Sequence, residues 1–206
     1  MTQQYIVKKK ESLHMNASLS SGANILNAIL IHLPKHVVKH SYRVEQLSAV
    51  LAKYVPEDEL PEGIYPVAYQ AALAKAGRYY EIGIYLARND IQQRPVAAEK
   101  LLRQYWTIDI MPGFSGVIFE TVRSIRERHD GQGYPYALAG NDVPFHAQIC
   151  AIADTVDMII GDEFSIRKMQ KAKDFIRENN GSIFHPEAVQ CFEQAKDELF
   201  GLYKKL

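Results

Sequence analysis

Residues 127–144, with the sequence ERHDGQGYPYALAGNDVP, interrupt the helical periodicity of this chain over its longest stretch. Three glycines and one proline fall within residues 130–143, and both residue types disfavour a continuous helix. Asn141 or Asp142 can cap a following helix, whose first turn accepts Pro144. The stretch therefore predicts a long loop that joins two helices.

Outside this loop, apolar residues recur at helical spacing, and strand-like alternation of useful length is missing. Prolines and charges mark residues 55–63 as a second loop, and Pro34 separates the first two helices. We predict an all-α bundle in one domain over residues 19–206, preceded by a lead-in at residues 1–18. The helices are expected near residues 19–33, 36–54, 64–80, 94–106, 115–128, 144–161, 165–179 and 185–204.

Composition narrows the class of protein. The chain has 206 residues, of which 47% are hydrophobic, and its 24 basic and 24 acidic side chains give a formal net charge of +0. This balance argues against general nucleic-acid binding, although it allows a local basic pocket. The polar first fourteen residues and the short apolar run 25–33 predict a soluble, cytoplasmic protein without a membrane segment. Cys150 and Cys191 are expected to be buried free thiols.

Two polar residues fall on apolar helix faces. The buried stripe expected for residues 36–54 includes His40, and the apolar helix 144–161 carries Asp154 in its middle. A buried histidine is either a hydrogen-bonded core residue or a metal ligand. A buried carboxylate needs an ion-pair partner, a cation or a proton, because burying it bare costs several kcal/mol. Spacing alone leaves both alternatives open.

The loop also carries a motif. The run Asp130–Pro135 reads DGQGYP, then come Leu138, Gly140, Val143 and Pro144, and residues 151–154 read AIAD. This pattern resembles the HD-GYP family of cyclic-dinucleotide phosphodiesterases, in which HHExxDGxGYP leads into LxGxxIP and a helix containing AIAD. Residues 40–44 (HSYRV) match the family's HSxRV, and residues 184–186 (FHP) look like its FDP. The resemblance spans roughly residues 20–200 and implies an all-α HD-superfamily bundle with a GYP loop.

The family implies two or three iron or manganese ions, which activate water against a phosphodiester. By the resemblance, His40 and Asp154 remain as metal-ligand positions and Glu127 is kept. The family's LHDIGK is matched to residues 73–78 (LAKAGR), and its HP to residues 94–95 (RP). The lost ligand positions would then hold Ala74, Lys75, Arg94, Ile125 and Arg126. We therefore expect no metal cofactor and a protein that is catalytically inactive or nearly so.

Three alternatives accompany this reading. A single metal ion held by His36, His40, Asp154 and His129 would leave residual phosphodiesterase or phosphohydrolase activity. The substituted cations would instead form ion pairs with Asp154 and Glu127 in a purely structural module. The third alternative is an anion pocket of Lys75, Arg78, Arg94 and Arg126, which would bind a cyclic dinucleotide or another phosphate-bearing nucleotide without cleaving it.

Two further features bear on a signalling role. Several aromatic side chains are either core residues or stacking partners for a base: Tyr79, Tyr80, Tyr105, Trp106 and Tyr134. The GYP loop, with Asp130, Gly131, Gly133, Tyr134 and Pro135, either packs on its own bundle or contacts a protein partner. The family resemblance suggests a diguanylate cyclase as one such partner.

Overall fold

A computed structural model describes residues 22–106 and 111–205, and it confirms the all-α prediction. Within these two ranges no strand is present, and two isolated β-bridges, Asp130 with Ala139 and Asn180 with Phe184, join loop segments. None of the helices in these ranges is long and apolar enough to cross a membrane. The expected lead-in at 1–18 and the start of the expected helix 19–33 lie outside the described residues.

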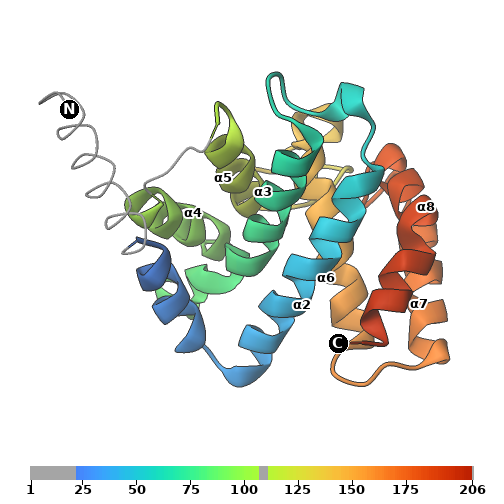
Figure 1. The fold of residues 1–206 in the computed structure, drawn as a ribbon, viewed down its shortest axis with the longest axis horizontal. Coiled ribbons are helices and arrows are strands. Elements are labelled where there is room, and N and C mark those ends of the chain that lie inside the picture. Colours follow the sequence, from blue (N-terminus) through green and yellow to red (C-terminus); the bar gives the residue numbers. More distant parts are fainter. Residues whose placement is uncertain (1–21, 107–110, 206) are drawn as a thin grey trace, which may run out of the picture.

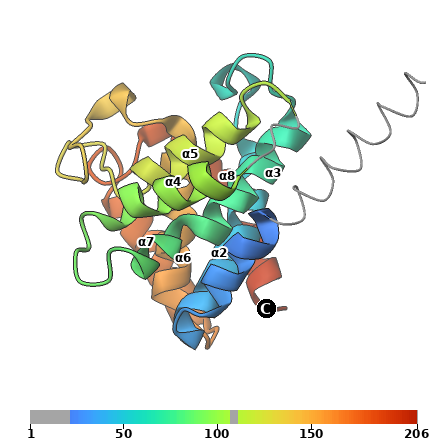
Figure 2. The same ribbon diagram turned by 90° about the vertical axis from the view of Figure 1, so that its left-hand side faces the viewer.

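Two central helices, α2 (Lys35–Leu51) and α6 (Phe145–Ile160), hold the bundle together (Figure 1). On one side they contact α3 (Pro66–Tyr79) and α5 (Phe114–Ser124), and α4 (Arg94–Tyr105) packs on α5 (Figure 2). On the other side lie α7 (Ile166–Glu178) and α8 (Pro186–Tyr203). A helical segment at 22–31 precedes α2, and Pro34 separates the two as predicted.

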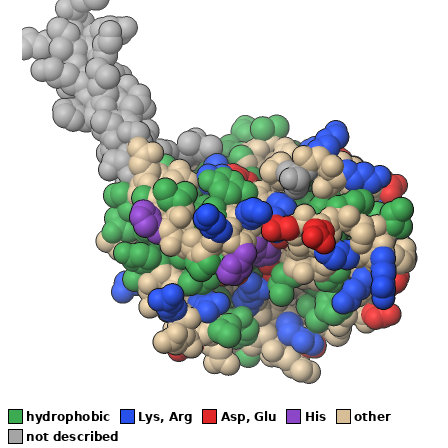
Figure 3. Space-filling view, turned by 90° about the horizontal axis from the view of Figure 1, so that it is seen from below, with side chains coloured by type: hydrophobic (Ala, Val, Ile, Leu, Met, Phe, Trp, Pro, Cys, Tyr) green, Lys and Arg blue, Asp and Glu red, His purple; other side chains and the backbone are tan. Residues whose placement is uncertain are grey.

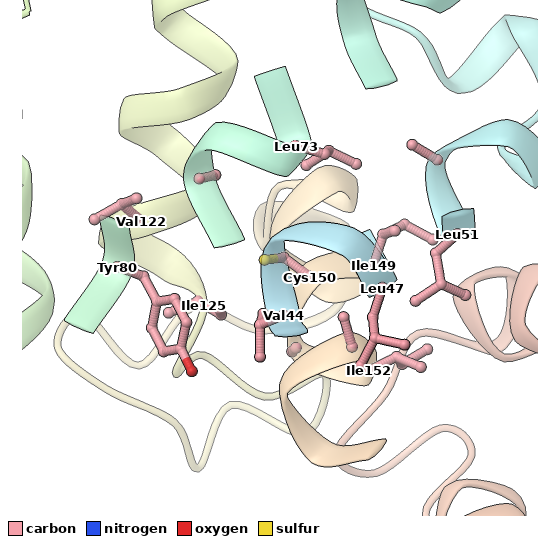
Figure 4. Close-up of a cluster of buried hydrophobic side chains, with 14 of the residues drawn as sticks. Val44, Leu47, Leu51, Leu73, Tyr80, Val122, Ile125, Ile149, Cys150 and Ile152 are labelled. Carbon is pink, nitrogen blue, oxygen red and sulfur yellow. The ribbon is translucent and has the colours of Figure 1, made fainter. Parts of the chain in front are cut away.

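Apolar side chains from α2, α3 and α6 fill the centre of the bundle (Figure 4). Val44, Leu47 and Leu51 recur at steps of three and four on α2 and are fully buried. Each such side chain contributes about 1.5–3 kcal/mol through the hydrophobic effect. Cys150 and Cys191 are buried free thiols, as expected. Burial raises the pKa of Cys150 to about 12 and that of Cys191 to about 11, so both stay protonated.

Most predicted helix boundaries agree with the structure within a few residues, but one turn was missed. The helix predicted at 64–80 ends at Tyr79, and the chain continues as the 3₁₀ helix η3 (Tyr80–Tyr85). Gly83 brings η3 against α4, because a Cβ there would lie 2.0 Å from the Arg94 carbonyl oxygen. This turn carries two residues of the site described below. Shorter 3₁₀ turns occur at η1 (Ala52–Tyr54), η2 (Glu57–Glu59) and η4 (Gly140–Asp142).

Candidate functional site

His40 on α2 faces two carboxylates of α6, as its place on the apolar stripe predicted. It donates from Nδ1 to Asp157 Oδ2 at 2.5 Å and from Nε2 to Asp154 Oδ1 at 2.9 Å. Asp154 and Asp157 are three residues apart and therefore share a helix face. Burial lowers the pKa of His40, but the two carboxylates outweigh it and raise the pKa to about 9. The imidazole is thus a cation that donates from both nitrogens.

Asp154 is almost completely buried and has three side-chain partners. Arg126 Nη1 donates to its Oδ2 at 2.6 Å, and the Tyr80 hydroxyl and His40 donate to Oδ1. Burial alone would raise the pKa of Asp154, but the Arg126 and His40 cations hold it well below its usual range. The expected ion pair between a substituted cation and Asp154 is therefore present.

A second ion-pair group lies beside the first. Arg43 donates to Asp157 Oδ1 from Nε at 2.6 Å and to Asp162 Oδ1 from Nη1 at 2.6 Å. The Tyr203 hydroxyl, from the end of α8, also donates to Asp157. Sequence reasoning missed Asp157, although its spacing from Asp154 on the same apolar helix was the available signal. The lower face of the molecule shows histidine, basic and acidic side chains lying close together near its centre (Figure 3).

Residues of η3, rather than of α3, reach this cluster, which corrects the sequence match. Tyr80 donates to Asp154 Oδ1 at 2.6 Å, and Glu81 Oε1 accepts from Arg126 Nη2 at 2.9 Å. The segment Tyr80–Gly83 (YEIG) keeps the Ile-Gly of the family's LHDIGK. Tyr80 and Glu81, six residues after Ala74 and Lys75, are thus the residues that reach the cluster, whereas Lys75 pairs with Glu45.

Two of the four predicted pocket cations lie elsewhere for the same reason. Lys75 Nζ is 3.3 Å from Glu45 Oε1, and Arg78 Nη1 is 2.5 Å from Glu45 Oε2. Arg78 also stacks over the Tyr42 ring, with 4.3 Å between the guanidinium carbon and the ring centroid. The structure brings together only Arg94 and Arg126. The prediction that Lys75 and Arg78 converge with Arg94 and Arg126 was therefore wrong.

Arg94 and Arg126 line the walls of two depressions. The first is an open hollow of about 410 Å³ beside the ion-pair cluster. Its walls are His36, Val37, His40, Arg43, Glu81, Ile84, Arg94, Arg126, Asp157, Met158, Gly161 and Asp162. The second is a small slot of about 40 Å³, which Glu81, Arg94 and Arg126 also line, together with Tyr134 of the GYP loop.

The GYP loop is fixed to the bundle by Glu127. This buried carboxylate accepts from the backbone N–H groups of Tyr136 at 2.7 Å and Leu138 at 3.1 Å. Both oxygens of Glu127 accept from the loop backbone and neither pairs with a substituted cation, so the prediction of an ion pair with Glu127 was wrong. Gly133 is required by close packing, because a Cβ there would lie 2.4 Å from the Arg128 nitrogen.

The remaining GYP-loop residues complete a compact turn. Arg128 donates from Nε to Asp130 Oδ1 at 2.9 Å, and the Gln132 N–H donates to the same oxygen at 3.0 Å. Gly131 has a φ of 75°, which favours glycine, and the Tyr134–Pro135 peptide bond is cis. Tyr134 lines the slot, so the loop contributes directly to the wall of the site.

The donor set does not fit a metal ion. In the ranges 22–106 and 111–205, no three His, Cys, Asp or Glu side chains are arranged to hold one. His40 and Asp154 are bonded to each other and to Tyr80, and Arg126 adds a positive charge at the same place. At about 4 Å, a like-charge contact costs on the order of a few kcal/mol. His36 does line the hollow, whereas His129 packs edge-on against His185, with 4.9 Å between ring centroids.

The aromatic residues divide between core and site. Tyr79 and Tyr80 are each 3% exposed, so neither presents a ring face to a ligand. Trp106 packs edge-on against Tyr79 with 6.4 Å between ring centroids, and Tyr105 is half-buried against the core. Of the aromatic residues named from the sequence, Tyr80 and Tyr134 both line the slot, Tyr80 as a buried residue of η3 and Tyr134 from the GYP loop.

The fold and the residues around His40 define a helical domain of the HD class. The sequence model of the HD domain family matches residues 24–188, which is most of the chain. This chain belongs to the HD domain family, and it is an HD-GYP-like member.

Curated relatives agree with this placement. A probable cyclic di-GMP phosphodiesterase of Vibrio cholerae is 37% identical over 68 residues, which cover 32% of this chain and 15% of the relative. A cyclic di-GMP phosphodiesterase of Thermotoga maritima is 28% identical over 81 residues, covering 38% of this chain and 22% of the relative. A cyclic di-GMP phosphodiesterase response regulator of Xanthomonas campestris pv. campestris is 31% identical over 75 residues, covering 35% and 20%. The chain thus matches less than a quarter of each of these relatives.

Proposed function

We propose that this chain is a catalytically inactive, or nearly inactive, HD-GYP-like signalling protein that binds a phosphate-bearing ligand without metal-dependent hydrolysis. The observation that carries the proposal is the 2.6 Å contact between Arg126 Nη1 and Asp154 Oδ2. A guanidinium bound to the retained carboxylate supplies the positive charge that a buried aspartate needs. It supplies no water of lowered pKa, which is what a metal ion contributes to phosphodiester hydrolysis.

The corrected match strengthens this proposal. Tyr80 and Glu81 replace the family's His-Asp pair, and Arg94, Ile125 and Arg126 replace further histidines of its motifs. Arginine binds phosphate oxygens through paired N–H groups, and Arg94 and Arg126 both line the hollow. A nucleotide or cyclic dinucleotide is therefore the ligand class that we propose.

A protein partner at the GYP loop is the second candidate. Glu127 accepts from two backbone N–H groups of the loop, and the Tyr136 residue of this loop is 51% exposed. Exposed aromatic residues on a fixed loop are typical of contact surfaces. Pull-down with the wild type and the Tyr136→Ala variant tests this candidate, and a true contact would lose the partner without lowering the melting temperature.

Residual phosphodiesterase activity is the alternative, since the curated relatives carry that name. The deciding experiment combines elemental analysis of the purified protein with assays of cyclic di-GMP and of a generic phosphodiester in manganese and in iron. We expect neither stoichiometric metal nor turnover. Bound metal in equal amount to protein, together with hydrolysis of either compound, would establish the enzyme instead.

A further inference from the structure

The charges around the hollow balance, with one exception. Four carboxylates (Glu81, Asp154, Asp157 and Asp162) face four cations (Lys39, His40, Arg43 and Arg126). Each of these eight groups has an ion-pair partner within the set. A ligand phosphate gains little from a cation that is already neutralised, because it must compete with a bound carboxylate.

Arg94 is the exception. Its Nη2 donates to the Arg88 carbonyl oxygen at 2.8 Å, and its Nε is buried without a hydrogen-bond partner. No carboxylate in the described parts of the chain forms an ion pair with it. The guanidinium thus lacks an acidic partner, and a ligand anion in the hollow would not have to displace a carboxylate from it. Arg94 therefore gives the hollow and the slot, both of which it lines, one surplus positive charge.

The walls around Arg94 fit the rest of a small ligand. Val37, Ile84 and Met158 line the open hollow, and Met158 is 67% exposed. Apolar walls with a few convergent polar groups are typical of small-molecule sites, and a volume of about 410 Å³ is near their lower end. Arg94 also begins α4, so the positive end of that helix lies on the same wall.

We infer that the hollow binds a ligand with a single phosphate group, a phosphate monoester such as a nucleoside monophosphate, through Arg94. This inference rests on the proposed function and narrows its ligand class. The phosphate accepts from Arg94, and the organic part lies along Val37, Ile84 and Met158. A cyclic dinucleotide carries two phosphates, and its second phosphate meets only groups that are already paired.

Isothermal titration calorimetry on the full chain tests the inference, in buffer free of phosphate and metal. The probes are guanosine 5′-monophosphate, guanosine and cyclic di-GMP. We expect one monophosphate bound per chain, no binding of guanosine, and cyclic di-GMP binding at least about tenfold weaker than the monophosphate. Cyclic di-GMP binding as tightly as the monophosphate, or no monophosphate binding at millimolar concentration, overturns it.

Single-residue variants test whether the phosphate binds at Arg94. Arg94→Ala should weaken monophosphate binding by about tenfold or more, because a hydrogen bond to a charged group is lost. Arg103→Ala is the matched control on the same helix, since Arg103 lies outside the hollow and pairs with Glu99 at 2.9 Å. If Arg94→Ala unfolds, Arg94→Gln provides the same test, because glutamine also removes the charge but keeps more of the side chain than alanine does. Unchanged affinity in a folded Arg94 variant contradicts the inference.

The proposed lack of catalysis and the proposed phosphate-monoester ligand can be refuted independently of each other. Stoichiometric metal with hydrolysis of cyclic di-GMP would refute the proposed lack of catalysis, whatever the calorimetry shows. A metal-free, inactive protein that binds no phosphate monoester would leave that proposal standing and refute the ligand inferred here.

Discussion

The guanidinium of Arg126 lies between two acidic side chains, with Nη1 2.6 Å from Asp154 Oδ2 and Nη2 2.9 Å from Glu81 Oε1. These residues come from three separate segments: η3, the residues just after α5, and α6. The guanidinium neutralises the buried Asp154 carboxylate. It also places a fixed positive charge beside the oxygen atoms of Asp154 and Glu81, which could otherwise bind a metal ion. Arg126 therefore both stabilises the buried carboxylate and opposes the binding of a cation at this place.

Arg126→Ala should destabilise the protein by about 3 kcal/mol, because it leaves the buried Asp154 carboxylate without its guanidinium. Denaturant unfolding measures the change. The double variant Arg126→Ala/Asp154→Asn should recover part of the loss, since the uncompensated charge is then gone. A double variant that shows the plain sum of both single losses would mean that the two residues are not energetically coupled.

Stability should also fall as pH rises above neutrality. The pKa of His40 is about 9 in the folded protein and about 6.5 when unfolded, so the folded state holds its proton more tightly. This stabilisation is complete below the unfolded pKa and is lost as pH rises through the folded pKa. The free energy of unfolding should therefore drop by on the order of 2 kcal/mol between about pH 6.5 and 8.5, a range below that in which the thiols of the unfolded chain ionise.

His40→Gln should flatten this pH dependence, because the variant has no imidazole to titrate. Urea unfolding at a series of pH values measures it. His32→Gln is the control, since His32 is exposed and its ring bonds the backbone carbonyl of Ala28 in the preceding turn. A slope that survives in His40→Gln would assign the titration to another group.

The fold was largely predictable because helices are local. Apolar spacing located α2 through α8, and Pro34, Asn179 and Gly181 marked breaks that the structure retains. The end of α3 was not predictable in this way. Tyr80 and Ile82 continue an apolar pattern, and the change to η3 depends on the close approach of Gly83 to α4, which is a tertiary contact.

The site was predicted in part, and the error follows from that turn. His40 and Asp154 were identified from helix faces and do lie together. Lys75 and Arg78 were misplaced because both LAKAGR and YEIG carry a glycine in a tight helix contact. Gly77 lies against α2, with 2.9 Å from its would-be Cβ to the Val44 carbonyl oxygen. Spacing along one segment does not reveal which of two glycines faces the site.

Gly83→Ala tests the packing of η3 on α4. The added Cβ would lie 2.0 Å from the Arg94 carbonyl oxygen and 2.9 Å from the Ala98 nitrogen, both of which are backbone atoms. We expect a loss of at least about 1–3 kcal/mol by thermal or chemical unfolding, as for other overpacked sites. Gly116→Ala in α5 meets no atom within 4 Å and should be neutral or stabilising by up to about 1 kcal/mol. Equal effects of the two changes would contradict this packing.

Glu127→Ala should free the GYP loop without unfolding the bundle. The backbone N–H groups of Tyr136 and Leu138 would lose their acceptor, so their hydrogen exchange should accelerate. Glu127→Gln keeps one acceptor oxygen and should lie between the variant and the wild type. Unchanged exchange at both amides in Glu127→Ala would show that other contacts hold the loop.

Metal binding by designed variants distinguishes a His-Asp position at Tyr80 and Glu81 from one at Ala74 and Lys75. In the double variant Tyr80→His/Arg126→His, two new imidazoles join His40 and Asp154, which gives four donors of the kinds that zinc prefers. The change also removes the guanidinium that repels a cation. We expect one zinc ion per chain with a dissociation constant on the order of micromolar or tighter, and none for the wild type.

Ala74→His/Arg126→His adds the same number of histidines and serves as the control. Residue 74 lies within α3, six residues before the η3 residue Tyr80 that reaches the His40 cluster, so an imidazole at 74 should not complete the set. Calorimetric titration of both variants with zinc distinguishes the two registers. Tight zinc binding by the Ala74 variant and not by the Tyr80 variant would restore the original match, and it would move the lost His-Asp pair from η3 back to α3.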